Sequence, residues 1–228
     1  FDTALTPENV ILYAQSVHPI SDATHKKSLY EELTCRIRDP ENGIVKASRF
    51  ISAIRQVGYE AQMDKSVINK FLRDFKDNFD NSRSYALNLN VTPFSNREYF
   101  KWFRDELLQL SREQRKCLSF EFVEAQFVRH LDFMRPVAKM LAGLGCHLMV
   151  GQAGRTIVST HYLKEVDIRY LKLHRSLVAK IDQRHENQLF VRSMLGAAAN
   201  SKTKIIAVGI ENQNELNTLI ELGVYGGQ

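Results

Sequence analysis

The chain has 228 residues, of which 44% are hydrophobic and 25% are charged, a composition typical of a globular protein with a large buried core. This composition excludes a disordered chain, a collagen-like chain and a coiled coil. The longest central stretch without Lys, Arg, Asp or Glu, residues 140–154, is shorter than the roughly 20 residues that a membrane-spanning helix needs. The net charge of +5 is compatible with weak binding to a polyanion but does not require it.

Short apolar runs alternate with segments of helical periodicity along the chain. Two strands joined by a polar loop are expected near the N-terminus, at 10–20 and 28–37. Further strands are expected at 85–91, 118–123, 146–150, 168–173 and 204–209. The helices expected between them are 47–58, 63–79, 96–110, 126–144, 159–165, 187–199 and 212–222.

The alternation of strands and helices predicts the fold class. The later strands are near-continuous apolar runs, which is typical of strands buried on both faces of a parallel sheet. Repeated strand–helix units in a chain of this length predict a TIM-like (β/α)8 barrel, with a doubly wound open sheet as the alternative. No GxGxxG or P-loop sequence follows a predicted strand, which disfavours the dinucleotide-binding form of the open sheet.

Several polar or small residues lie near the carboxyl ends of the predicted strands, where TIM barrels carry their chemistry. These residues are Glu32, Asn90, Glu121, Gly151, Gln152, Lys172, Val208 and Gln228. Charged side chains within buried strands need a partner or a function, so Glu32, Glu121 and Lys172 require explanation. Two interpretations are open: an internal ion pair of Lys172 with one glutamate, or a functional site.

An ordered series of short motifs resembles the EAL domain, the bacterial phosphodiesterase that cleaves cyclic di-GMP on a TIM-like barrel. The family patterns E-A-L-L-R, N-[LV]-S, E-I-T-E, Y-L-K, L-K-I-D-R-S and G-V-E correspond to 32–36, 90–92, 121–124, 162–164, 171–176 and 209–211. The resemblance covers essentially the whole chain, so we expect 1–228 to be a single degenerate EAL domain. The first residue is Phe1 and the family's closing segment would follow Gln228, so we expect a fragment of a larger protein with an incomplete last strand and helix.

The resemblance also implies which residues would carry the chemistry. In active members the first Glu, the Asn, the Glu of E-I-T-E and an Asp pair hold two divalent metals, while a Lys and a further Glu position the attacking water. Here Gly151 and Gln152 stand at the Asp pair and Val208 stands at that further Glu. The remaining pocket is expected to be vestigial and to comprise Glu32, Asn90, Glu121, Lys172, Glu211 and Gln228. We expect no bound metal, no cofactor and no useful phosphodiesterase activity, because two neighbouring cations need anionic ligands.

The pattern is further similar to degenerate GGDEF–EAL regulators, which are anchored in the inner membrane with this domain in the cytoplasm. Such regulators promote RNase E-dependent decay of the Csr small RNAs, and their EAL domain binds the unphosphorylated glucose-specific enzyme IIA of the phosphotransferase system. The resemblance therefore implies an inactive module that binds a partner protein. A cyclic di-GMP receptor without hydrolysis and a direct RNA-binding module are the alternatives, although the altered site disfavours cyclic di-GMP.

Two kinds of surface are candidates for these contacts. Tyr99 and Trp102 lie off the main apolar stripe of the 96–110 helix and would form an exposed partner surface, unless they pack against a neighbouring element. The basic residues that could form an RNA surface, or merely solvated helix faces, are Arg112, Arg115, Lys116, Arg169, Arg175, Lys180 and Arg184.

Overall fold

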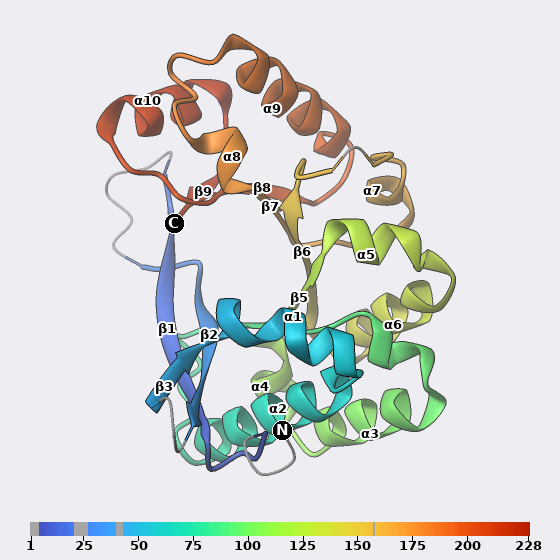
Figure 1. Ribbon diagram of the computed structural model, residues 1–228. Coiled ribbons are helices and arrows are strands. Elements are labelled where there is room, and N and C mark those ends of the chain that lie inside the picture. Colours follow the sequence, from blue (N-terminus) through green and yellow to red (C-terminus); the bar gives the residue numbers. More distant parts are fainter. Residues whose placement is uncertain (1–4, 21–26, 40–42, 157) are drawn as a thin grey trace.

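The strands of the protein close into a barrel surrounded by helices (Figure 1). The computed structural model describes residues 5–20, 27–39, 43–156 and 158–228. The strands are β1 (Val10–Pro19), β2 (Tyr30–Asp39), β3 (Gly43–Lys46), β4 (Tyr85–Asn88), β5 (Leu118–Val123), β6 (His147–Ala153), β7 (Tyr170–Leu173), β8 (Lys204–Ala207) and β9 (Gly226–Gly227). Within the described residues they form one nine-stranded sheet in the order β1-β9-β8-β7-β6-β5-β4-β2-β3. Because β1 also pairs with β2, eight strands close the barrel and β3 extends the edge of β2, which confirms the predicted TIM-like fold.

The first strand departs from the all-parallel arrangement of a regular (β/α)8 barrel. β1 is antiparallel to both β2 and β9, whereas the other seven barrel strands run parallel to one another: β2, β4, β5, β6, β7, β8 and β9. The register places Val17 opposite Tyr30. A parallel connection needs a crossover of a dozen or more residues, and the segment between β1 and β2 is too short to provide one.

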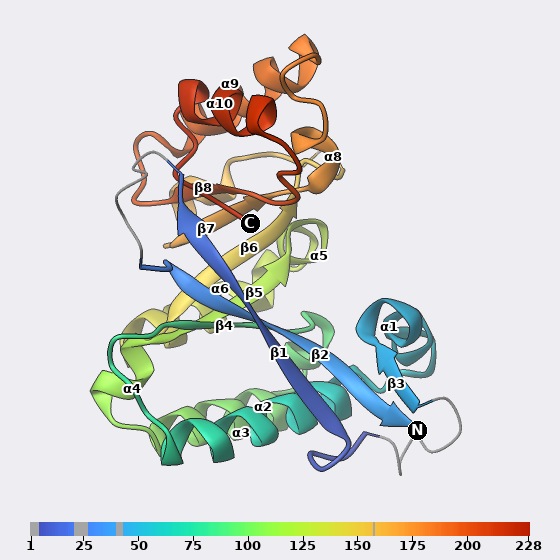
Figure 2. The same ribbon diagram turned by 90° about the vertical axis from the view of Figure 1, so that its left-hand side faces the viewer.

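The helices cover the outside of the barrel. They are α1 (Ala47–Val57), α2 (Glu60–Asp77), α3 (Arg97–Leu108), α4 (Arg112–Lys116), α5 (Glu124–Arg129), α6 (Leu131–Leu144), α7 (Tyr162–Glu165), α8 (Arg175–Val178), α9 (His185–Ala198) and α10 (Gln213–Leu222), with a 3-10 turn η1 (Thr92–Ser95). In the described part of the chain, none of these helices has the length and apolar character needed to cross a bilayer. Figure 2 shows α4 at one end of the barrel and α1, α5 and α8 at the other, toward which the parallel strands point.

Some observed helices differ from the predicted ones. The helix expected at 126–144 is interrupted at His130, whose φ of −119° and ψ of 34° are not helical, so it forms α5 and α6. The short helix α4 was not predicted, because it has no buried residue and therefore no apolar periodicity. A capping box between Ser111 and Gln114 marks its start instead.

Side chains of the strands point alternately outward, into a core shared with the helices, and inward, into a core inside the barrel. Outward-facing residues pack against the helices, as where Phe103 of α3 meets Phe120 of β5 with ring centroids 5.0 Å apart. Inward-facing residues fill the lower barrel with a separate buried cluster: Val17, Tyr30, Ala86, Met149, Tyr170 and Ile206. Since side chains alternate with a period of two, the next inward position on each strand lies one layer higher, at the mouth.

The last strand is only two glycines long and closes the barrel within this chain. A Cβ atom on Gly226 would lie 2.7 Å from Ile206 Cδ1 and 3.0 Å from the carbonyl oxygen of His18. The close approach of β9 to β8 and β1 therefore requires glycine. Gly226 and Gly227 supply a strand that joins β8 to β1.

Candidate functional site

Polar side chains converge at the mouth of the barrel. They line a cavity of about 350 Å³ and include Glu32, Asn88, Glu121, Gln152, Lys172 and Gln228. The first five lie on β2, β4, β5, β6 and β7, and Gln228 directly follows β9. The predicted barrel topology therefore brings Glu32, Glu121, Lys172 and Gln228 together, although they are far apart in the sequence.

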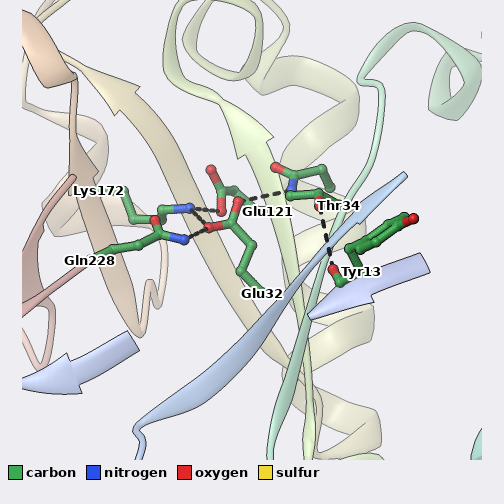
Figure 3. A network of polar contacts seen from close by, with 7 residues as sticks. Tyr13, Glu32, Thr34, Glu121, Lys172 and Gln228 are labelled. Atoms are coloured by element: carbon green, nitrogen blue, oxygen red, sulfur yellow. Dashed lines mark hydrogen bonds and ion pairs between the residues drawn. The ribbon is translucent and has the colours of Figure 1, made fainter. Parts of the chain in front are cut away.

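Lys172 binds both buried glutamates at once. Its ammonium Nζ lies 2.7 Å from Glu32 Oε2 and 2.8 Å from Glu121 Oε2, and the three side chains are 5%, 11% and 8% exposed. Glu32 also accepts hydrogen bonds from Gln228 Nε2 at 2.7 Å and from Asn88 Nδ2 at 3.1 Å. Figure 3 shows Lys172 and Gln228 directed at the two carboxylates. The internal ion pair that the sequence left open is therefore present, and it involves both glutamates.

The environment of each carboxylate sets the direction of its pKa shift. Burial alone would raise the pKa of Glu32, but the Lys172 ammonium and the hydrogen bonds from Asn88 and Gln228 lower it. Burial raises the pKa of Glu121, and its interaction with Lys172 only partly opposes this effect. The two glutamates hold the pKa of Lys172 above its usual value despite burial. Lys172 is therefore charged at neutral pH and serves as the cation of the mouth.

Gly151 allows Glu121 to take this position. A Cβ atom built on Gly151 would overlap Oε1 of Glu121 and lie 2.8 Å from its Cδ. Any larger side chain at position 151 would thus compete with Glu121 for the same space. The ion pair between Glu121 and Lys172 therefore depends on the space that Gly151 leaves free.

The structure corrects the expectation for Asn90. Its side chain points away from the mouth and donates from Nδ2 to Asp64 Oδ1 at 2.8 Å, while its backbone N–H donates to Asp64 Oδ2 at 3.0 Å. Asn88 occupies the mouth instead, because it pairs in register with Glu121. The sequence Asn88-Leu89-Asn90 offers two asparagines of the same parity, so the alternation of side chains alone could not distinguish them.

Of the remaining predicted site residues, Gln152 and Val208 lie at the mouth, whereas Glu211 lies on the surface. Gln152 and Val208 line the cavity, and Gln152 Oε1 accepts a hydrogen bond of 2.8 Å from Arg155 Nη1. Gln152 has a φ of 57°, an uncommon value for a residue other than glycine. Glu211 was expected in the pocket, but it is exposed and its Oε1 lies 3.8 Å from Arg175 Nη2, so this expectation was wrong.

Some residues of the mouth had not been singled out from the sequence. Gln15 on β1 and Thr34 on β2 line the cavity. Gln15 faces Glu32 across the antiparallel β1–β2 pair. The antiparallel direction of β1 brings Gln15 to the mouth. In the sequence, only the short segment between β1 and β2 indicates that direction.

The donor set at the mouth does not fit a pair of divalent metal ions. The two glutamates are already bound by an ammonium group, and Gly151 has no side chain to offer. Among the residues that the structure describes, no group of three or more His, Cys, Asp or Glu side chains is arranged to hold a metal ion. Binding of two cations would require additional anionic ligands.

The proposed partner surface is not exposed as expected. Tyr99 is 4% exposed, and its hydroxyl donates to Asp64 Oδ2 at 3.2 Å. Trp102 is half-buried, with its ring centroid 5.4 Å from that of Tyr99. The two aromatic residues therefore belong to the packing of α3 against the barrel.

The basic candidates do not form one surface. Arg115 is committed to the fold, because its guanidinium donates to the carbonyl oxygens of Leu144 and Leu110 at 2.8 Å each. Arg112 and Lys116 are exposed on α4, and Arg169 precedes β7, so these residues lie at the end of the barrel opposite the mouth. The remaining basic candidates are exposed around α8 and the start of α9: Arg175, Lys180 and Arg184.

Comparison with known proteins identifies the family. The family model of the EAL domain matches residues 2–228. The chain belongs to the EAL family. This EAL domain is 34% identical over 199 residues to the "RNase E specificity factor CsrD" of Escherichia coli K12, covering 87% of this chain and 30% of that protein. It is 22% identical over 218 residues to the "Cyclic di-GMP phosphodiesterase PdeA" of Borreliella burgdorferi, covering 95% of this chain and 32% of that protein. The chain thus spans about a third of the length of these curated relatives.

Solved structures share the fold of this EAL domain. The ligand-free S helix–GGDEF–EAL structure of Vibrio cholerae LapD matches with a TM-score of 0.87 at 19% identity, covering 100% of this chain and 54% of that one. The PaMucR phosphodiesterase, solved as a cyclic di-GMP complex, matches with a TM-score of 0.85 at 20% identity, covering 100% of this chain and 92% of that one. At such identities the matches establish the architecture, and the chemistry must be argued from the residues of this mouth.

Proposed function

We propose that this EAL domain is a catalytically inactive regulatory module that binds a partner protein and promotes RNase E-dependent turnover of Csr small RNAs. The observation that carries the proposal is the replacement of carboxylates around the mouth: Gly151, Gln152 and Val208 stand where the family resemblance places acidic residues. Glu32 and Glu121 remain, and Lys172 binds both of them. The similarity to an RNase E specificity factor supports the assignment to RNA turnover.

The altered residues around the mouth support loss of hydrolysis. A metal-activated water needs ions held by fixed oxygen ligands, whose positive charge stabilises the attacking hydroxide. Gly151, Gln152 and Val208 supply no carboxylate, and a side chain at position 151 would collide with Glu121. Rebuilding the metal site would therefore require Glu121 and Lys172 to separate as well as new ligands to be added.

The proposed partner is the unphosphorylated glucose-specific enzyme IIA of the phosphotransferase system. In this proposal, the domain lies in the cytoplasm as one part of a protein anchored in the inner membrane. Binding of enzyme IIA would couple the supply of glucose to the stability of the regulatory RNAs. The fold supports a binding role because a closed barrel with one continuous outer core gives a stable surface for a partner.

The first experiment tests hydrolysis and nucleotide binding. We expect no metal-dependent cleavage of cyclic di-GMP by the 228-residue chain in magnesium or manganese, and no saturable heat of binding at micromolar cyclic di-GMP in magnesium or calcium. Cleavage that is abolished by Glu32→Ala would overturn the assignment as an inactive domain. Binding without cleavage would favour a non-hydrolysing receptor, a role for which the open mouth cavity leaves room.

The second experiment tests the partner. Calorimetric titration with enzyme IIA should show saturable binding of the unphosphorylated form and at least tenfold weaker binding of the phosphorylated form. Equal affinity for both forms, or no binding to either, would contradict the proposed coupling to glucose supply.

A further inference from the structure

Cationic side chains gather at the end of the barrel opposite the mouth. Lys27 lies shortly before β2, Arg83 before β4, Lys116 before β5 and Arg169 before β7, while Lys204 begins β8. Because these strands are parallel members of one barrel, their starting ends meet on the same side. We call these five residues the basal cluster. Four of them are exposed, and Arg169 is half-buried.

Contacts between successive strands hold part of this cluster together. The Arg169 guanidinium contacts Nε2 of His147, and that atom lies 3.1 Å from the carbonyl oxygen of Lys116. The backbone N–H of Lys204 donates to the carbonyl oxygen of Arg169 at 3.0 Å. Lys116, Arg169 and Lys204 are therefore brought side by side from three separate segments of the chain.

Electrostatic effects on neighbouring groups agree with this arrangement. Burial raises the pKa of the Cys117 thiol and Asp80 adds to the shift, whereas Lys27 and Arg169 oppose it, so all three charges lie near the start of β5. Burial, with Arg169, lowers the pKa of His147 to about 4. His147 is therefore neutral at pH 7 and adds no charge of its own to the cluster.

Nearby carboxylates neutralise only part of the positive charge. Asp80 pairs with Arg83 at 3.6 Å, and Asp167 is exposed next to Ile168. In the described part of the chain, no carboxylate lies within 4.0 Å of the charged atoms of Lys116, Arg169 or Lys204, in contrast to Lys172 at the mouth. Glu31 at the start of β2 and the exposed Glu113 on α4 also lie at this end, as does the exposed Arg112. The excess of positive charge is therefore modest, and such an excess attracts polyanions.

We propose that the basal cluster binds the phosphate backbone of single-stranded RNA. Lys204 Nζ lies 4.8 Å from the ring centroid of the half-buried Tyr225, so a cation and an aromatic side chain occupy the same site. Single-stranded RNA is recognised by such combinations, in which cations follow the backbone and rings contact the bases. This inference rests on the proposed role in RNA turnover and places the RNA contact at the base.

Fluorescence anisotropy with a labelled 20-nucleotide uridine RNA tests the inference on the full 228-residue chain. We compare wild type with the triple variant Lys116→Gln, Arg169→Gln and Lys204→Gln at several salt concentrations. Loss of three phosphate contacts should reduce the slope of log K against log [salt] by about 2, and should weaken binding about a hundredfold at 0.1 M salt. If the triple variant does not fold, Lys116→Gln with Lys204→Gln should still reduce the slope by about 1.4.

A matched variant separates a specific surface from net charge. Lys180→Gln, Arg184→Gln and Arg192→Gln remove the same charge from exposed positions between α8 and α9 and on α9. This variant should bind RNA like wild type, and Arg169→Lys should keep most of the affinity because it keeps the charge. Equal weakening by both triple variants, no effect of either, or tighter binding to anionic phosphatidylserine vesicles than to RNA would overturn the inference.

The outcome remains distinct from that of the proposed function. The basal triple variant should bind unphosphorylated enzyme IIA with unchanged affinity. If the basal triple variant binds RNA as tightly as wild type while enzyme IIA binding is intact, only the basal surface is rejected. Basal RNA binding in a chain that does not bind enzyme IIA would reject the proposed partner only.

Discussion

Two regions of the protein bury carboxylates in different ways, and their pKa values shift in different directions. At the mouth, Glu32 lies against the Lys172 ammonium, which lowers the pKa of the carboxyl. Beside α3, Asp64 is 2% exposed and has no cationic partner among the contacts described; it accepts hydrogen bonds from Asn90 and Tyr99. Burial raises the pKa of Asp64 to about 7 despite those donors.

The comparison shows what kind of partner a buried carboxylate requires. Neutral donors reduce the cost of desolvation, but a nearby cation reverses its effect on the pKa. Glu121 shows the limit of this compensation, because it shares a single ammonium with Glu32 and its pKa remains raised. One lysine therefore compensates for about one of the two carboxylates at the mouth.

Removal of the cation should have the largest effect. Lys172→Met leaves two buried carboxylates without a counterion and should lower the free energy of unfolding by about 3–5 kcal/mol. Urea unfolding at pH 7 measures the change. Lys139→Met, at an exposed position on α6, should change stability by less than about 0.5 kcal/mol.

The same prediction can be reversed by removing the charges together. A triple variant with Glu32→Gln, Glu121→Gln and Lys172→Met should recover most of the lost stability, since no charge then remains buried. A Lys172→Met protein as stable as the Lys139→Met control would show that the mouth does not depend on its ion pairs.

A methyl group at Gly151 should have the next largest effect. Gly151→Ala forces Glu121 to move from Lys172 and should destabilise the protein by about 1–3 kcal/mol. Gly143→Ala on α6 is the matched control, because nothing lies within 4 Å of its Cβ position and alanine favours a helix by about 0.5–1 kcal/mol. Thermal unfolding should separate the two variants in opposite directions, and equal behaviour would contradict the packing link between Gly151 and Glu121.

Loss of a single donor to Asp64 should have a smaller effect. Tyr99→Phe removes one hydrogen bond to the buried carboxyl, which should cost about 1 kcal/mol and raise the pKa of Asp64 further. Carbon-detected NMR follows the titration directly. In wild type, the Asp64 carboxyl should titrate near pH 7, in contrast to exposed carboxyls near pH 4.

The two carboxylates should also give opposite dependences of stability on pH. The pKa of Asp64 is raised in the folded state, so its contribution to stability decreases as the pH rises from about 4 through 7. The pKa of Glu32 is lowered, so its contribution is present above its usual range and is lost as the pH falls below that range. Urea unfolding of Asp64→Asn and Glu32→Gln at pH 3, 5 and 8 checks both signs.

The basal cluster should contribute least to stability. Lys116→Gln with Lys204→Gln should change the free energy of unfolding by less than about 0.5 kcal/mol, because both side chains are exposed. A large loss of stability would mean that these cations support the fold as Lys172 does, and it would contradict the predicted difference between the two regions.

The sequence by itself determined the barrel and the chemical problem at its mouth. Alternating apolar runs and helical segments predicted the strand–helix repeats, because each element must bury one apolar face. The charged residues Glu32, Glu121 and Lys172 within apolar strands indicated that a partner was needed, since buried charges are costly when unpaired. The ordered motifs further indicated the EAL family, which the match over residues 2–228 confirmed.

Only the tertiary structure decided how those residues meet. The pairing of β4 with β5 places Asn88, and not Asn90, beside Glu32, because both asparagines share the same parity and strand register depends on distant segments. The closed barrel likewise brings Lys172 between two glutamates and gathers Lys116, Arg169 and Lys204 at the opposite end. Side-chain periodicity is local and can be read along a chain, whereas ion pairs and charged surfaces arise from segments that only closure of the barrel brings together.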